Sequence, residues 1–339
     1  MISLLHQISR GAFLRLAICT TAGLMLVSCT APSSDHRQTK RPIPVIYDSD
    51  VGDDIDDTWA VGFLLRCPEL DVKMVMGDYG KPDYRARLFA KFLERAGRTD
   101  IPVGIGVEVD PTKRTGRQWD WVKDYDLKNY PWKIHTNGVQ AMIDLIMNSK
   151  QQVTVIAVGP TPNIAEALRR EPRIAKRARF VGMHGSVASA TNPKPIAEYN
   201  VVRDPKSLQQ AFTAPWDITI TPLNTCAQVV LKDDKYQRIY QSNDPIAKAI
   251  VENYRHWLIN RGRGTDELIS VRSSTLFDTV AVYLAFRDDL LNMEQINIRV
   301  TDDGFTVIDP TAKQMAVAMT WKDLGAFEDF LIERLTNGK

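Results

Sequence analysis

The sequence predicts an α/β protein, a single domain with an open, mostly parallel, doubly wound sheet and a hairpin near the C-terminus. Short apolar segments alternate along the chain with segments of helical periodicity, which is the pattern of a parallel sheet covered by helices. Several apolar segments lack polar and apolar alternation, as expected for strands buried on both faces. At 339 residues, 44% hydrophobic and 25% charged, the chain can bury a large core.

The expected strands are short and bounded by polar or glycine-containing segments. They are 44–48 (PVIYD), 72–78 (VKMVMGD), 103–107 (VGIGV), 153–159 (VTVIAVG), 179–183 (RFVGM) and 218–223 (ITITPL). Closer to the C-terminus, Asp303-Gly304 lies within the segment 296–309, and this dipeptide favours a tight turn between antiparallel strands.

The segments between these strands predict helices. They are 84–96 before Gly97, 139–147, 163–169, a helix opened by Pro245 and ended by Gly262, a helix from Ser274 past Ala285, and 321–335. A further helix follows Gly52, with apolar residues at Ile55, Trp59, Val61 and Phe63. No internal repeat and no linker follows residue 42, so residues 43–339 are expected to form one domain.

The first 28 residues have the pattern of an export signal. They contain no acidic residue, and Arg10 and Arg15 precede an apolar stretch at 16–27 that is short for a membrane span. The stretch ends in Leu-Val-Ser before Cys29, which resembles the lipobox of bacterial lipoproteins. We therefore expect cleavage after residue 28, lipid on Cys29 and a flexible polar tether at 29–42. The alternatives are an ordinary secretory signal or a buried N-terminal helix.

Under this hypothesis the N-terminal lipid anchors the protein to a membrane, which is its expected partner. Thr30, rather than aspartate, follows the modified cysteine, which favours the outer membrane, with the domain facing the periplasm. Loss of Arg10 and Arg15 would reduce the 43 basic residues to 41, equal to the 41 acidic ones. The formal charge of +2 thus gives no reason to expect nucleic-acid binding.

Two cysteines, Cys67 and Cys226, lie within the expected domain. No CxxC pattern is present, so neither a zinc knuckle nor a redox motif is indicated. In an oxidising periplasm the two could form a disulfide, but nothing in the sequence shows that they meet, so we expect two separate buried thiols.

An acidic segment carries the strongest functional signal. Six of the ten residues from Asp48 to Asp57 are aspartates, and they follow a buried strand and precede a helix. Such a turn lies at the carboxyl edge of a parallel sheet, where ligands bind. Crowded carboxylates raise one another's pKa unless a cation neutralises them or they face bulk water. Oxygen ligands alone favour a hard divalent ion, calcium or magnesium.

Three other interpretations of this segment explain it less well. A solvated helix-capping turn explains two or three aspartates, but not six. An EF-hand loop starting at Asp48 fails, because its sixth residue is Asp53 rather than glycine and its twelfth is Trp59 rather than glutamate. A haloacid dehalogenase-type phosphatase also begins strand-Asp-x-Asp, but it gives no role to Asp56 and Asp57.

The segment resembles the nucleoside hydrolase family, specifically its inosine-uridine preferring members. The family hallmark is a strand ending Asp-x-Asp-x-Gly followed by Asp-Asp, present here as Asp48-Ser49-Asp50-Val51-Gly52 and Asp56-Asp57. The family's shorter form has one residue between the glycine and the Asp pair, whereas this chain has three. Further resemblances follow in order at 96–106, 153–168, 198–205, 220–224 and 277–278. The resemblance implies the nucleoside hydrolase fold and a calcium-dependent N-ribohydrolase.

The resemblance also assigns roles to individual residues. It implies calcium ligands at Asp50, Asp57, Asp278 and the main-chain carbonyl of Val158. Asp50 is also the expected general base, because its carboxylate could contact both metal and water. The residues expected to bind the nucleoside are Asp56, Asp78, Met183, Glu198, Asn200 and Phe277. Family members are often dimers or tetramers, so a homo-oligomer is also implied.

Two positions depart from the family pattern. Asp78 stands where asparagine is frequent, which adds charge beside the sugar. Phe277 stands where some members have a histidine that could protonate the leaving base, and an aromatic residue there favours a purine or another flat base. These departures leave two further hypotheses: a lipoprotein that binds ribose or nucleosides without catalysis, and a hydrolase of a different N-glycoside. Tyr254, His256 and Trp257 could serve the base, but Tyr254 and Trp257 are also expected core residues.

Overall fold

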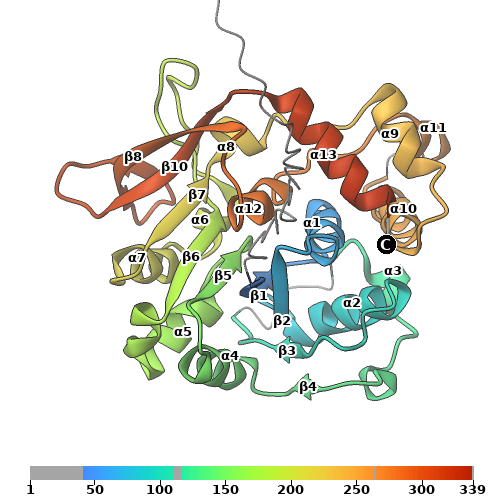
Figure 1. Cartoon of the computed structure of the whole chain (residues 1–339), viewed down its shortest axis with the longest axis horizontal. Coiled ribbons are helices and arrows are strands. Elements are labelled where there is room, and N and C mark those ends of the chain that lie inside the picture. Colours follow the sequence, from blue (N-terminus) through green and yellow to red (C-terminus); the bar gives the residue numbers. More distant parts are fainter. Residues whose placement is uncertain (1–40, 110–115, 263–264, 338–339) are drawn as a thin grey trace, which may run out of the picture. The chain divides into compact units, whose positions relative to one another are not determined.

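In the part of the chain that the structure describes, ten strands form one sheet in the order β4-β3-β2-β1-β5-β6-β7-β10-β8-β9. The structure is a computed structural model, and it describes residues 41–109, 116–262 and 265–337, which belong to one unit spanning Arg41–Lys339 (Figure 1). The predicted signal peptide, Cys29 and nearly all of the tether lie outside the described residues. None of the described helices has the length and apolar character needed to cross a membrane.

The strands are β1 (Ile43–Ser49), β2 (Leu70–Gly77), β3 (Val103–Ile105), β4 (Ile134–His135), β5 (Val153–Ala157), β6 (Ala178–Met183), β7 (Ile218–Thr221), β8 (Leu291–Val300), β9 (Thr306–Ile308) and β10 (Gln314–Trp321). The helices are α1 (Asp56–Leu65), α2 (Pro82–Arg95), α3 (Trp119–Val122), η1 (Leu127–Asn129), α4 (Gly138–Asn148), α5 (Pro162–Arg170), η2 (Pro172–Lys176), α6 (Tyr199–Arg203), α7 (Pro205–Thr213), α8 (Leu223–Cys226), α9 (Asp233–Tyr240), α10 (Pro245–Asn260), α11 (Thr265–Val271), α12 (Thr279–Leu284) and α13 (Leu324–Thr336).

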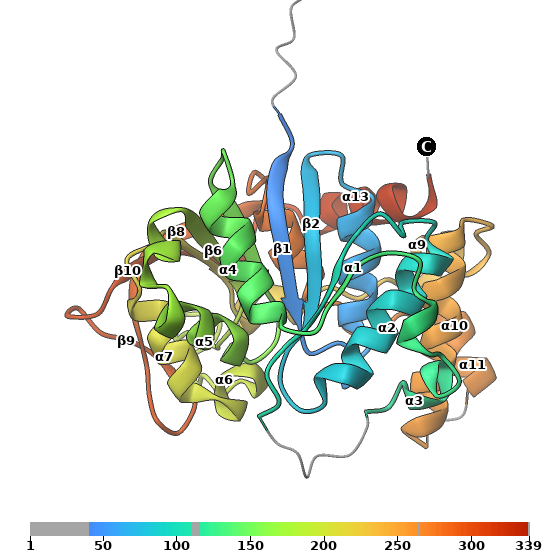
Figure 2. The ribbon, with the colours of Figure 1, turned by 90° about the horizontal axis from the view of Figure 1, so that it is seen from below.

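The two faces of the sheet bury separate apolar cores, because successive side chains of a strand point to opposite faces. In β1, Val45 and Tyr47 join the core formed with α1, α2, α10, α12 and α13. Ile46 between them joins the core formed with α4, α5 and α7. Figure 2 shows α4, α5 and α7 on one side of β1 and β2, and α1, α2 and α10 on the other. Each central strand is therefore apolar on both faces, as its sequence predicted.

The chain order of the strands reverses at β1, which positions the site. From β1 the chain builds outward through β2, β3 and β4, then returns to place β5 in parallel on the other side of β1. Helices on opposite faces leave a crevice at such a switch point, beside the carboxyl ends of the strands. The acidic segment follows β1 at this position.

The predicted fold class is confirmed, and six of the strands lie where the sequence placed them. The hairpin is also confirmed: β8 and β9 pair antiparallel, and Gly304 in their turn has φ +88°. Cys67 and Cys226 are buried free thiols, as expected.

Two predicted helix starts are wrong. The helix expected from near Ser274 to past Ala285 begins only at Thr279, with Asp278 as its N-cap residue, and it already ends at Leu284. The helix expected from Trp321 begins at Leu324, because Trp321 is the last residue of β10 and pairs with Leu291 of β8.

Candidate active site

The turn after β1 brings Asp50 to the edge of the sheet. Gly52 has φ +116°, a conformation that residues with a side chain rarely adopt, and a Cβ there would lie 2.6 Å from the ring of Tyr84. The Tyr84 hydroxyl donates a hydrogen bond of 3.1 Å to the Gly52 carbonyl. These constraints turn the chain sharply and leave Asp50 only 5% exposed.

The longer acidic motif is held by donors from distant segments. The Gln118 amide donates to the Asp54 carbonyl at 2.6 Å, and the Trp257 indole donates to the Asp53 carbonyl at 3.2 Å. The Asp54 carboxylate accepts from the backbone N–H of Ile55. The two additional aspartates are thus part of an ordered turn, and α1 begins at the second Asp pair.

Three carboxylates from two helices meet beside this turn. Asp56 and Asp57 occupy the first turn of α1, and Asp278 is the N-cap residue of α12, although its side chain makes no capping hydrogen bond. Each offers an oxygen within 4.8 Å of the other two, and all three residues are at most 4% exposed. Ser49 donates to the Asp57 carboxylate at 2.5 Å, which fixes its orientation. The packing of α12 against α1 therefore joins the start and the end of the domain in one site.

The electrostatics of this trio would favour a bound cation. Burial raises the pKa of Asp56, Asp57 and Asp278 well above its usual value, and the neighbouring carboxylates, Asp50 among them, raise it further. Like charges at this distance disfavour joint ionisation. A hard divalent cation would supply the missing positive charge, and oxygen donors are the ligands that such ions prefer.

Asp48 and Asp78 lie next to the trio at the ends of β1 and β2. Both are fully buried, and burial raises the pKa of each, that of Asp48 to about 7. Asn163 donates to Asp48 at 2.7 Å, whereas neither oxygen of Asp78 has a hydrogen-bond partner among the described residues. A Cβ on Gly159 would approach Asp78 to 2.7 Å, so a glycine at this position leaves room for the carboxylate.

The loop and helix after β6 contribute Glu198 and Asn200 to the site near Asp50. Glu198 accepts from the backbone N–H groups of Gly185, Asn200 and Val201, and burial raises its pKa to about 7. Asn200 donates to the carbonyls of Val158 and Met183, both at 3.1 Å. Its amide nitrogen is thus committed to the protein, which leaves its oxygen to accept from a ligand.

The predicted site residues therefore converge on one region. Asp57 and Asp278 meet as predicted, whereas the third carboxylate of the trio is Asp56 rather than Asp50. The Val158 carbonyl, expected to bind metal, already accepts from Asn200, and its second lone pair remains. Sequence reasoning missed Asn163, which orients Asp48, and Arg85, a buried guanidinium behind the turn. Asn163 lies in the segment 153–168 that resembles the family, but the resemblance gave it no role; no local motif marked Arg85.

A cavity of about 350 Å³ lies beside the acidic turn. Phe277 and Asp54 line it, together with Tyr254 and Trp257 of α10. Tyr254 and Trp257 are at most 3% exposed and belong to the core, as expected, yet they also face this space. Arg261 stacks on Trp257, with its guanidinium carbon 4.4 Å from the ring centre. Arg272, Ser273, Ser274 and Thr275 also line the cavity, so it offers polar groups beside its aromatic ones.

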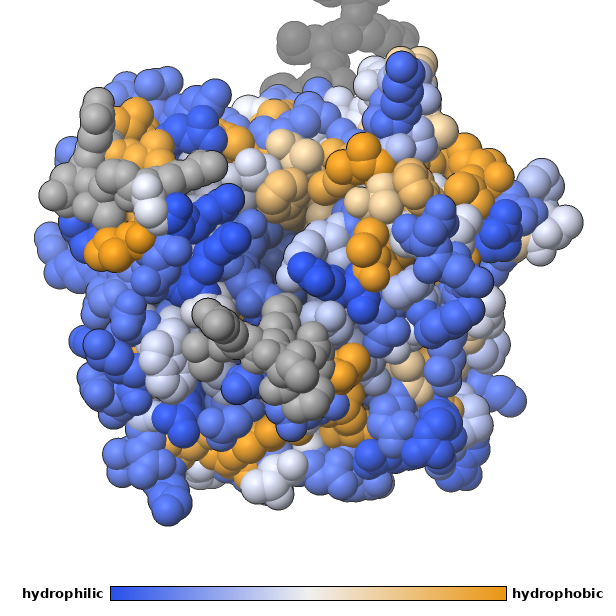
Figure 3. All heavy atoms as spheres, turned by 180° about the vertical axis from the view of Figure 1, so that it is seen from behind, coloured by the Kyte–Doolittle hydropathy of each residue, from blue (hydrophilic) through white to orange (hydrophobic). Residues whose placement is uncertain are grey.

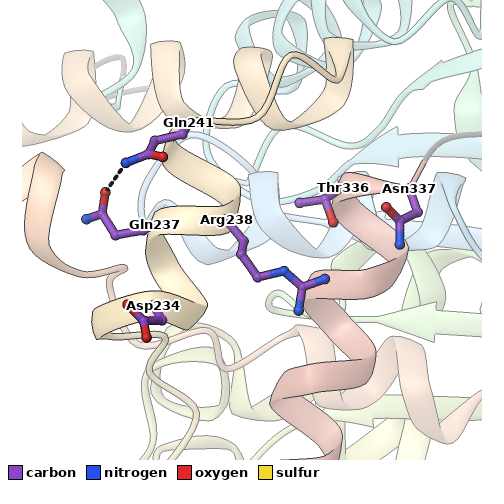
Figure 4. Close-up of a pocket in the computed structure, with 6 residues that line it drawn as sticks. All are labelled: Asp234, Gln237, Arg238, Gln241, Thr336 and Asn337. Carbon is purple, nitrogen blue, oxygen red and sulfur yellow. Dashed lines mark hydrogen bonds between the residues drawn. The ribbon is translucent and has the colours of Figure 1, made fainter.

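Another pocket, of about 490 Å³, lacks the cluster of carboxylates expected of the active site. It lies between α9 and the end of α13 (Figure 4), and its lining residues are Asp234, Gln237, Arg238, Gln241, Thr336 and Asn337. It contains one carboxylate and one guanidinium, so it lacks an acidic cluster. On the face seen in Figure 3, hydrophilic residues predominate, interrupted by separate apolar groups and by a hollow near the centre.

The doubly wound sheet with a buried carboxylate site at its switch point defines an α/β protein that binds its ligand at the carboxyl edge of the sheet. The sequence profile of the family described as "Inosine-uridine preferring nucleoside hydrolase" matches residues 45–328. The chain belongs to this family, whose members are nucleoside hydrolases.

Curated relatives agree with this assignment. "Probable uridine nucleosidase 2" of Arabidopsis thaliana is 27% identical over 299 residues, and the match covers 82% of this chain and 89% of the relative. "Pyrimidine-specific ribonucleoside hydrolase RihA" of Salmonella arizonae is 28% identical over 312 residues, with 86% of this chain and 98% of the relative covered.

Solved structures share the fold. "Plant nucleoside hydrolase - PpNRh1 enzyme" superposes with a TM-score of 0.74 at 24% identity, covering 88% of this chain and 100% of that one. "Purine-Preferring Ribonucleoside Hydrolase from Gardnerella vaginalis" superposes with a TM-score of 0.69 at 21% identity, covering 86% and 98%.

Proposed function

We propose that this protein hydrolyses the N-glycosidic bond of a ribonucleoside to ribose and free base, and that it requires calcium. The observation that carries the metal requirement is the buried trio of Asp56, Asp57 and Asp278. No basic side chain among the described residues forms an ion pair with any of these three carboxylates. A site that buries three acids without an ion-pair partner fits a divalent cation.

The residues that would hold the ion are Asp50, Asp57, Asp278 and the carbonyl of Val158, with Asp56 close enough to share it. When bound, calcium supplies positive charge that orients water and ribose hydroxyls and lowers the pKa of that water modestly. Calcium accepts six to eight oxygen ligands in flexible geometry, so five protein donors leave room for water and sugar.

Asp50 is the proposed general base. Its carboxylate takes a proton from a water molecule as the water oxygen attacks the anomeric carbon. The C–N bond breaks, and its electron pair leaves with the base. Positive charge develops on the sugar in this transition state, and the surrounding carboxylates stabilise it.

Polar groups around the site are proposed to bind the ribose. Asp56 and Asp78 can accept from ribose hydroxyls, and Asp78 has two buried oxygens without a hydrogen-bond partner among the described residues. Glu198 and Asn200 face the sugar from the other wall, and Met183 lines it. Because the carboxylate of Glu198 is fixed by three backbone donors, it is preorganised before substrate arrives.

For the base, we propose a purine-leaning preference that rests on Phe277. This aromatic side chain lines the cavity next to the acidic turn, where it can stack on a flat leaving group. A second candidate is a pyrimidine nucleoside, which the names of the two curated relatives favour.

A nucleoside panel tests the function. Purified protein is incubated with inosine, guanosine, adenosine, uridine and cytidine, with calcium and with a chelator, and reducing sugar is measured. We expect calcium-dependent ribose release, faster from the purine nucleosides. Binding without product would support a non-catalytic nucleoside-binding protein instead. Calcium binding with no product from any of the five would support a hydrolase of another N-glycoside.

We also propose that Cys29 carries lipid and that the enzyme faces the periplasm from the outer membrane. The support is the sequence pattern that ends at this cysteine. Radiolabelled palmitate should enter the wild-type chain and not the Cys29→Ser variant. Label in both variants, or in neither, would contradict the proposal.

A further inference from the structure

Arg85, on α2, is a buried arginine that contacts both turns bearing active-site aspartates. It is 1% exposed, although it carries a permanent charge. One terminal nitrogen, Nη1, donates to the carbonyl of Asp50 and, at 2.8 Å, to that of Val51. The other, Nη2, pairs with the carboxylate of Asp53 at 3.2 Å.

The remaining donor reaches the second turn. Nε of Arg85 donates to the carbonyl of Tyr79 at 2.6 Å. Tyr79 directly follows Asp78 and has φ +44°, a left-handed conformation that costs energy for a residue with a side chain. The guanidinium thus holds a strained turn in the position that orients Asp78.

A glycine at the end of β2 makes room for the contact between Arg85 and the two turns. A Cβ on Gly77, the last residue of β2, would lie only 2.4 Å from the Cβ of Arg85. The absence of that atom lets α2 approach the end of the strand and place the guanidinium between the two turns. A lysine could not replace it, because an ammonium group lacks the planar fork that bonds in several fixed directions.

We propose that Arg85 is a positioning residue that locks the Asp50 turn to the Asp78 turn, so that the general base and the ribose-binding carboxylate keep a fixed separation. This inference rests on the proposed function for its catalytic consequence. It also gives Asp53 a role: the extra aspartate in the long motif anchors the turn to Arg85 rather than contacting the substrate.

The test compares Arg85→Lys and Arg85→Met with Arg87→Met. Arg87 lies on the same helix and pairs with Asp83 at 3.0 Å, outside the site, so it is the matched control. Circular dichroism and thermal unfolding establish which variants fold. Ribose release from inosine and uridine gives kcat and KM, and hydrogen exchange measures protection of peptides covering 47–59, 76–84 and 291–300.

We expect folded Arg85→Lys to lose about 100-fold in kcat, because a displacement of a catalytic group by about 1 Å has an effect of this size. Its KM should change by less than about threefold. Exchange should increase in 47–59 and 76–84 and stay unchanged in 291–300, whereas Arg87→Met should keep the wild-type kcat and the wild-type exchange of 47–59 and 291–300. If Arg85→Met does not fold, Arg85→Lys still decides the outcome.

Unchanged exchange in the two site peptides of Arg85→Lys would overturn the inference. Increased exchange with kcat within threefold of wild type would also overturn it, because the contact would then be structural only. If wild type itself releases no ribose, the proposed function fails, and the exchange data alone decide whether Arg85 locks the turns.

Discussion

The carboxylates of Asp57 and Asp278 approach within 4.8 Å of each other, although their residues lie near opposite ends of the domain sequence. The first turn of α1 carries one, and the N-cap of α12 carries the other. Burial raises the pKa of both carboxyl groups, and the Asp57 carboxylate raises that of Asp278 further. The fold therefore maintains an electrostatic repulsion that only a bound cation or a proton relieves.

Replacing Asp278 tests this repulsion. Asp278→Asn should weaken calcium binding at least tenfold, measured by titration calorimetry without substrate, because one charged ligand is lost. The metal-free variant should be more stable than metal-free wild type by about 1 kcal/mol, since removal of a destabilising functional group usually gains 0.5–2 kcal/mol. Asp288→Asn, at an exposed position after the same helix, is the control. Equal calcium affinity in both variants would exclude Asp278 as a ligand.

Calcium should stabilise the folded protein. A ligand that binds only the native state, present at 100 times its Kd, adds about 2.7 kcal/mol to the free energy of unfolding. Thermal unfolding with and without a chelator should therefore show a clear drop in Tm on calcium removal, and re-addition should restore it. Magnesium at the same concentration provides the comparison. A Tm that is insensitive to both ions would contradict a metal site in the acidic cluster.

The buried imidazole of His184 should make the free energy of unfolding depend on pH. It is fully buried, and burial lowers its pKa from 6.5 to about 4, despite its hydrogen bond to the Gly159 carbonyl. Between these values the unfolded chain binds a proton that the folded protein does not, so stability falls as the pH drops from 6.5 to 4.

The loss attributable to this histidine is about 3 kcal/mol over that range, at 1.36 kcal/mol for each pKa unit. Urea denaturation of wild type and His184→Gln at several pH values measures it. The glutamine amide can donate to the same carbonyl but does not titrate. Parallel stability curves for the two proteins would rule out the assignment.

Phe277 should control selectivity for the base. Phe277→Ala removes a stacking surface from the cavity and should lower kcat/KM for inosine about tenfold, the scale of an aromatic contact of 0.5–1.5 kcal/mol. Uridine, with a smaller ring, should lose less. Phe277→Leu keeps an apolar side chain but has no ring, so it distinguishes the loss of ring stacking on the base from the loss of packing in the cavity. Equal losses for both nucleosides would show that this residue is only part of the core.

The fold could be predicted where the sequence pattern is local. Continuous apolar runs identified the buried parallel strands, because strands covered on both faces need no polar residues. β10 was missed because its two ends are polar or only partly buried, with Gln314 exposed and Trp321 partly buried, and β4 was missed because it is only two residues long. The end of β10 also explains the misplaced start of the last helix.

The site could be predicted only where its residues share a motif. Asp50, Asp56 and Asp57 lie in one run, and Asp278 was found by family resemblance. Arg85 was not found, because its role depends on how closely α2 packs against Gly77. A buried arginine and an exposed one look the same in the sequence of an amphipathic helix.

Asp50→Ala tests the proposed mechanism most directly. Ribose release from the best nucleoside of the panel and calcium affinity are measured on this variant, with thermal unfolding to show that it folds. The mechanism predicts loss of detectable ribose release and weaker calcium binding in a folded protein. Ribose release at the wild-type rate would contradict the mechanism and remove Asp50 as the general base.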